Sequence, residues 1–169
     1  MLRAVAMCVL AVIGVGVARS DSSPSGRDWS ADRFLLGRWS CELTRPGHEH
    51  AREEAVYSLG LDDHWLKLID TQSPDKPDTR PLTTEAYETF DERLKKWVYV
   101  SLGSDGDYGL SYSDGWKDGI KIYGPSPEDK AAWQLIATKV SDREFTEDVE
   151  LAADGQWIRN SSLHCTKLE

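Results

Sequence analysis

Two histidines with a spacing suited to metal binding, His48 and His50, occur early in the chain. On an extended strand, residues i and i+2 point to the same side, so both imidazoles can reach one ion, with Glu53 or His64 as a third ligand. A Pro-Gly pair precedes the histidines, however, and marks a turn in which polar side chains face solvent. We therefore expect a solvated hairpin here and no metal, with metal binding as the alternative.

Two charged residues fall in phase with apolar faces of their predicted strands. Glu147 shares the face of Phe145, and Arg159 shares that of Trp157 and Leu163. A charge on an inward face is costly unless it is paired. We therefore predict an interior Glu147–Arg159 pair, which is either structural or holds a polar head group of a ligand.

The chain contains no motif typical of nucleophilic catalysis. No Gly-x-Ser-x-Gly sequence occurs, and carboxylates are too numerous to single out a catalytic pair. We expect that the protein is not an enzyme. The alternative is a barrel enzyme whose cavity holds a cluster of titratable groups with shifted pKa values, and whose activity would depend on pH.

The first twenty residues have the layout of a secretory signal. Arg3 supplies a positive charge, an apolar run covers residues 4–17, and small residues end the segment. The run is shorter than the roughly 20 residues of a membrane-spanning helix. We predict a signal peptide over residues 1–20, cleaved after Ala18 or Ser20, and hence a periplasmic or secreted protein with no membrane span after cleavage; an uncleaved anchor is the alternative.

Removal of this signal takes Cys8 away and leaves Cys41 and Cys165. An even pair in an oxidising compartment favours a disulfide, with two buried thiols, or a metal-binding or catalytic thiol, as alternatives. The pair joins the two ends of the domain, and closing so long a loop is worth roughly 4–5 kcal/mol in the chain-entropy model.

Length and charge bound the class of protein. The chain has 169 residues, 40% of them hydrophobic and 29% charged, which fits one domain. A net charge of -9 argues against binding to nucleic acid or to anionic lipid, because both need a basic face. The sequence gives no oligomeric state.

The elements that must position these residues are short strands. Residues 21–27 read as a flexible leader and residues 28–36 as one short helix, and a period-two pattern then starts at Gly37 and continues to the end. Turn residues of the Asp-Gly and Asp-Asp type separate most of the segments. The predicted strands cover residues 38–43, 50–59, 64–71, 83–90, 96–102, 108–113, 119–123, 131–140, 144–151 and 156–167.

About ten short strands with almost no helix are typical of an up-and-down barrel or a sandwich. Closure into a barrel is favoured because it removes the sheet edges. A closed meander also makes the first and last strands neighbours, which brings Cys41 and Cys165 together. We predict a single all-β barrel domain over residues 28–169.

An ordered set of short motifs resembles a known family. Residues 36–39 (Leu-Gly-Arg-Trp) resemble the opening Gly-x-Trp of lipocalin-like barrels. Further motifs follow at residues 87–91 (Tyr-Glu-Thr-Phe-Asp), 97–98 (Trp-Val), 113–119 (Ser-Asp-Gly-Trp-Lys-Asp-Gly), 154–157 (Asp-Gly-Gln-Trp) and 165–167 (Cys-Thr-Lys). The set is similar to the exported bacterial proteins of domain of unknown function family 1579 over about residues 35–167, with Phe90 where a second tyrosine is common. The resemblance implies a lipocalin-like β-barrel and brings no established activity.

His164, beside Cys165, is also similar to the single histidine with which nitrobindin-like barrels hold haem. If Leu163 and Cys165 face inward, alternation turns His164 outward, unless a bulge reverses it. We therefore predict no cofactor.

Seven tryptophans either fill the core or line a cavity for a small molecule. From strand phase, the cavity-lining residues are predicted to be Trp65, Tyr87, Trp97, Tyr99, Tyr112, Trp133, Glu147 and Arg159. The leading interpretation is an exported barrel that binds a small apolar or amphipathic molecule. The alternatives are an envelope structural or interaction module with a packed core and, less favoured, a barrel enzyme or a haem or metal binder.

Overall fold

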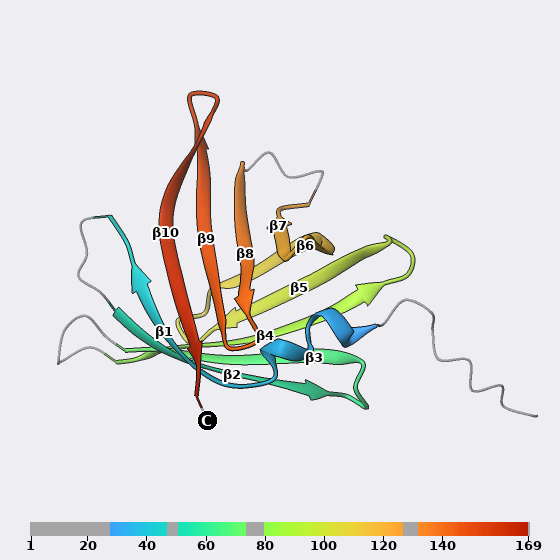
Figure 1. The fold of residues 1–169 in the computed structure, drawn as a ribbon. Helices are drawn as coiled ribbons and strands as arrows, with labels where there is room; N and C mark the ends of the chain where they lie inside the picture. The colour runs from blue at the N-terminus through green and yellow to red at the C-terminus, as the bar shows by residue number, and fades with distance from the viewer. Residues whose placement is uncertain (1–27, 47–50, 74–79, 127–131, 169) are drawn as a thin grey trace, which may run out of the picture.

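The computed structural model describes residues 28–46, 51–73, 80–126 and 132–168 (Figure 1). The predicted signal peptide over residues 1–20, the leader over residues 21–27, and His48 and His50 all lie outside the described residues.

Within the described residues, ten antiparallel strands form a closed up-and-down barrel, in which each strand pairs with its neighbours in sequence and β1 pairs with β10 (Figure 1). This arrangement confirms the predicted fold class. The strands are β1 (Gly37–Thr44), β2 (Ala51–Gly60), β3 (Trp65–Gln72), β4 (Leu82–Asp91), β5 (Lys96–Gly103), β6 (Tyr108–Lys117), β7 (Ile120–Gly124), β8 (Trp133–Ser141), β9 (Glu144–Ala153) and β10 (Gln156–Lys167).

The two ends of the sheet are joined covalently as well as by backbone hydrogen bonds. Cys41 lies directly opposite Cys165 in the β1–β10 register, and the two form a disulfide. Both side chains are fully buried. The bond spans 124 residues of sequence, so it removes a large share of the conformational freedom of the unfolded chain.

Two 3-10 turns, η1 (Trp29–Ala31) and η2 (Arg33–Leu35), replace the single short helix predicted over residues 28–36. Asp28 caps the first turn, because its side chain accepts a hydrogen bond from the Ser30 amide. The break falls at Asp32, whose side chain is 1% exposed and bonds to groups inside the barrel. The hydrogen bonds of Asp32 to distant residues therefore outweigh the local preference of residues 28–36 for one continuous helix.

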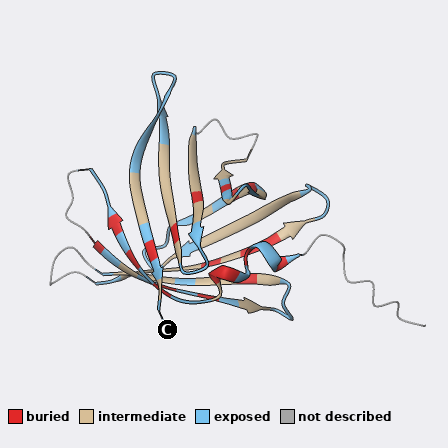
Figure 2. Ribbon diagram, in the orientation of Figure 1, coloured by how far each residue is buried: buried red, intermediate tan, exposed pale blue. Residues whose placement is uncertain are grey.

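These turns cover one end of the barrel, and the core lies beneath them. Trp29 Nε1 donates to the Asp63 carbonyl at 2.9 Å, and Lys167 Nζ donates to the Phe34 carbonyl at 2.7 Å. The buried cluster there includes Phe34, Trp39, Tyr57, Phe145 and both cysteines. Figure 2 shows buried residues gathered around this end, whereas the tip of the β9–β10 hairpin is exposed.

A bulge lengthens β6 beyond the end predicted at Ser113. The β6–β7 register shifts between Ser113 and Trp116, and Gly115 between them has φ +91°. Left-handed backbone of this kind suits glycine, and a Cβ at Gly115 would lie 2.8 Å from Trp97 Nε1. The bulge re-aims the strand so that Trp116 packs against the core cluster.

Candidate ligand-binding site in the barrel

An interior cavity of about 190 Å³ lies beside the core cluster. It is larger than the ~150 Å³ apolar cavity that is known to hold benzene, and below the roughly 300 Å³ at which pockets for drug-sized ligands begin. It therefore suits a molecule about the size of one aromatic ring with a short substituent. Its walls are mostly apolar and aromatic, with two carboxylates: Leu35, Tyr57, Leu66, Leu68, Glu88, Tyr99, Ser101, Gly109, Leu110, Ser111, Trp116, Tyr123, Trp133, Leu135, Ala137, Phe145 and Glu147.

Three of the predicted cavity residues, Tyr99, Trp133 and Glu147, lie in this wall. Trp97 also faces the interior but lies outside the wall. It packs instead under the 3-10 turns, with its ring centroid 5.0 Å from that of Trp29.

The prediction that Trp65, Tyr87 and Tyr112 line the cavity is wrong. Leu66 and Glu88, which neighbour Trp65 and Tyr87 in sequence, are both buried and line the cavity. Strand alternation therefore places Trp65 and Tyr87 on the outer surface.

On that surface, the Trp65 and Tyr87 rings meet edge to face at 6.4 Å, and the Tyr87 hydroxyl bonds to Glu85. Tyr112 is flanked by the buried Ser111 and Ser113 and faces outward for the same reason. The error arose because a leucine, a glutamate and two serines, not the aromatic residues beside them, face inward at these positions.

The predicted interior pair of Glu147 with Arg159 is also wrong. The β9–β10 register shifts between Arg159 and Ser161, so the residues on either side of this bulge follow opposite phases. Arg159 consequently faces outward with its side chain 60% exposed, where it pairs with Asp148 at 3.3 Å.

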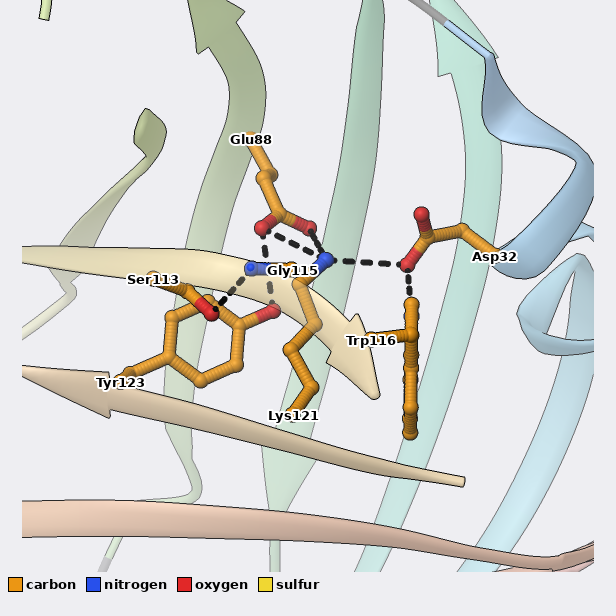
Figure 3. A network of polar contacts seen from close by, with 7 residues as sticks. All are labelled: Asp32, Glu88, Ser113, Gly115, Trp116, Lys121 and Tyr123. Atoms are coloured by element: carbon orange, nitrogen blue, oxygen red, sulfur yellow. Dashed lines mark hydrogen bonds and ion pairs between the residues drawn. The ribbon is translucent and has the colours of Figure 1, made fainter. Parts of the chain in front are cut away.

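A buried ammonium group forms the centre of one polar network in the barrel interior (Figure 3). Lys121 Nζ lies 3.0 Å from Asp32 Oδ1 and 2.9 Å from Glu88 Oε1, and the three side chains are at most 2% exposed. Tyr123 donates to Glu88 at 3.1 Å, and Trp116 Nε1 donates to Asp32 at 2.6 Å. This network links η1, η2 and strands β4, β6 and β7.

Aromatic rings complete the surroundings of this ammonium. Lys121 Nζ lies 4.6 Å from the Trp97 ring centroid and 5.4 Å from that of Tyr123, distances at which the ring faces attract a cation. Burial raises the pKa of Glu88, and the Lys121 charge opposes this shift.

Sequence reasoning missed this network because the hydropathy of β7 is inverted. Ile120 and Ile122 are 41% and 49% exposed, whereas Lys121 between them is fully buried. The usable signal was strand phase, because Lys121 shares a strand face with Tyr123, and Glu88 shares one with the buried Ala86.

Three further carboxyl groups with raised pKa values, those of Glu53, Asp70 and Glu147, face the barrel interior. Burial, with the nearby charges of Asp70 and Glu88, raises the pKa of Glu147 to about 7. Burial and the charge of Asp70 likewise raise the pKa of Glu53 to about 7. The pKa of Asp70 itself is raised to about 6 by burial.

Two other predicted candidates lie away from the cavity. His164 faces outward, as alternation predicted, with Nε2 2.8 Å from Glu144 Oε1. His64 is exposed at the β2–β3 turn, where its carbonyl accepts a hydrogen bond from Thr89. Among the described residues, no group of three His, Cys, Asp or Glu side chains is arranged to hold a metal ion.

Comparison with known proteins gives no family. No family model matches the chain, and no curated protein matches it. Among solved structures, a redesigned β-barrel, b11L5F_LGL, is 14% identical, covers 82% of this chain and 96% of its own, and has a TM-score of 0.47. EF1p2_mFAP2b bound to DFHBI is 13% identical, covers 82% of this chain and 97% of its own, and has a TM-score of 0.44. Membership of family 1579 therefore stays a prediction.

We expect Lys121→Met to lower the free energy of unfolding by about 3–5 kcal/mol, because it leaves two buried carboxylates without their cation. Urea denaturation measures the change. Lys117→Met, at an exposed position of β6, is the matched control and is expected to change stability by less than about 0.5 kcal/mol. Equal stability of the two variants would contradict a structural role for the buried ion network.

We also expect the protein to lose stability as the pH rises from about 5 to about 8, because the folded state holds the Glu147 proton more tightly than the unfolded chain does. This stabilisation is present below the unfolded pKa of 4.5 and lost as the pH rises through about 7. The slope contributed by one such carboxyl is at most about 1.4 kcal/mol per pH unit.

The variant Glu147→Gln isolates this contribution. It should reduce the slope of the unfolding free energy against pH, leaving the part that Glu53 and Asp70 contribute, whereas Glu54→Gln, at a side chain that is 69% exposed, should leave the slope as in the wild type. A pH profile of Glu147→Gln that overlays the wild-type profile would show that this carboxyl titrates normally.

Proposed function

We propose that the protein is an exported barrel that binds a small, largely apolar molecule in its interior cavity. The observation that supports this function is the cavity itself, with about 190 Å³ of space walled by leucines, aromatic rings and only two carboxylates. Interiors otherwise pack with few voids larger than a water molecule, so a space of this size in the centre of a barrel needs an explanation, and a ligand supplies one.

Export is part of the proposal. The disulfide between Cys41 and Cys165 supports it, because such bonds persist in oxidising compartments. The signal-like composition of residues 1–20 and the resemblance to the exported family 1579 point the same way. In the described part of the chain, no helix is long and apolar enough to cross a membrane.

One observation favours a second candidate, an interaction module. Ile120 and Ile122 point outward from β7 and are 41% and 49% exposed. Exposed apolar side chains on one strand suit contact with a partner protein. This function does not need the cavity, so occupancy of the cavity separates the two candidates.

Native mass spectrometry of protein purified from an oxidising compartment tests the proposed function. We expect a native mass above the sequence mass that is lost on denaturation. Ala137→Phe should abolish the excess mass, because Ala137 is 5% exposed and lines the cavity, so that a larger side chain fills the space.

The matched control is Ala152→Phe, at an exposed position near the tip of the β9–β10 hairpin, and it should keep the excess mass. Wild-type protein without excess mass, or an excess that Ala137→Phe retains, would shift the assignment to the interaction module.

A further inference from the structure

We infer that the ligand of this cavity carries a protonated amine, which binds to the Glu147 carboxylate. The inference rests on the proposed function and names the chemical class of the ligand.

The argument begins with the two carboxylates of the cavity wall, which differ in their partners. Glu88 is already bonded to Lys121 and Tyr123. The Glu147 carboxylate makes no hydrogen bond and no ion pair with any of the described residues.

The register explains why Glu147 lacks a partner. The residues opposite it on β8 and β10 are Ala137 and Leu163, and its neighbours on the same face of β9 are Phe145 and Val149. All four side chains are apolar and donate no hydrogen bond. A carboxylate held among them on an inward face is costly unless it takes up a proton, as its raised pKa of about 7 favours, or pairs with a cation brought into the cavity.

A second polar group in the same cavity is also unpartnered. Tyr57 is only 9% exposed and lines the cavity, yet its hydroxyl makes no hydrogen bond with the described residues. Glu147 lines the same cavity, and its charge adds to burial in raising the pKa of Tyr57. A phenol oxygen accepts a hydrogen bond, so Tyr57 can assist the carboxylate in binding an N–H donor.

The sign of the interior charge selects a cation. Glu53 and Asp70 also face the interior and interact electrostatically with Glu147, whereas Lys121, the buried cation beside Glu88, is already bonded to Asp32 and Glu88. An anionic ligand would add to this repulsion. A metal ion needs several oxygen ligands, and the described residues provide no such group. An ammonium on an apolar body satisfies both the carboxylate and the walls.

The barrel already holds one ammonium by the same chemistry. Lys121 is bonded to the carboxylates of Asp32 and Glu88 (Figure 3). Its ammonium also faces the aromatic rings of Trp97 and Tyr123. Glu147, with Tyr99 and Trp133 in the surrounding wall, offers an external amine one carboxylate and aromatic rings.

Three probes of similar shape test the inference: benzylammonium, benzyl alcohol and benzoate. Their affinities are measured by calorimetry at about pH 8, where Glu147, with a pKa of about 7, is mostly ionised. We expect benzylammonium to bind at least about tenfold more tightly than benzyl alcohol, since a charge-assisted hydrogen bond is gained, and benzoate to bind most weakly.

Glu147→Gln should lower the affinity for benzylammonium to within about twofold of the affinity for benzyl alcohol, which itself should stay unchanged. The control, Glu144→Gln, changes an outward carboxylate of the same strand that is 42% exposed and should keep the tenfold gap.

The outcomes separate the two proposals. Binding of benzyl alcohol or benzoate as tightly as benzylammonium overturns the charge preference and leaves the cavity as a ligand site. A tenfold gap that Glu147→Gln retains overturns the role of Glu147. If none of the three probes binds the wild type, both the inference and the proposed function fail.

Discussion

Pairing of the first strand with the last is the constraint on which the rest of the structure depends. Because β1 is hydrogen-bonded to β10, each of the ten described strands has two neighbours and no edge is left open. The Cys41–Cys165 disulfide fixes this pairing covalently at one register position. Once the sheet is closed, alternation along each strand decides which side chains enter the interior, and so it decides both the core and the cavity.

Closure creates an interior that is divided by chemistry. Beneath the 3-10 turns the space is filled by aromatic rings and by a fully bonded Lys121, whose charge is balanced by Asp32 and Glu88. Beside this network lies an unfilled cavity, and one of its two carboxylates, Glu147, has apolar residues opposite it on both neighbouring strands. The same fold thus contains a buried lysine paired with two carboxylates, which stabilises it, and the Glu147 carboxylate, which has no hydrogen bond or ion pair with the described residues and suits a ligand. This contrast connects the packing to the proposed function.

The sequence predicted the strands well because period-two alternation is a local signal. The ends of β5, β9 and β10, for example, were placed within two residues. Three physical effects were not predicted from the sequence. Bulges at Gly115 and beside Arg159 reverse the phase within a strand. The inverted pattern of β7 buries a lysine between exposed isoleucines. Aromatic side chains also pack well on the outside of a sheet, so Trp65 and Tyr87 were assigned to the wrong face. Export and family membership concern features that the described residues do not test, and they stay predictions.

A crystal structure of the protein grown with benzylammonium chloride tests the central claim most directly, that the barrel interior is a ligand site organised around Glu147. The account predicts one ring-shaped density inside the cavity between Tyr99 and Trp133, with its nitrogen within hydrogen-bonding distance of the Glu147 carboxylate. A cavity closed by repacked side chains, or a probe whose nitrogen points away from Glu147, would contradict it.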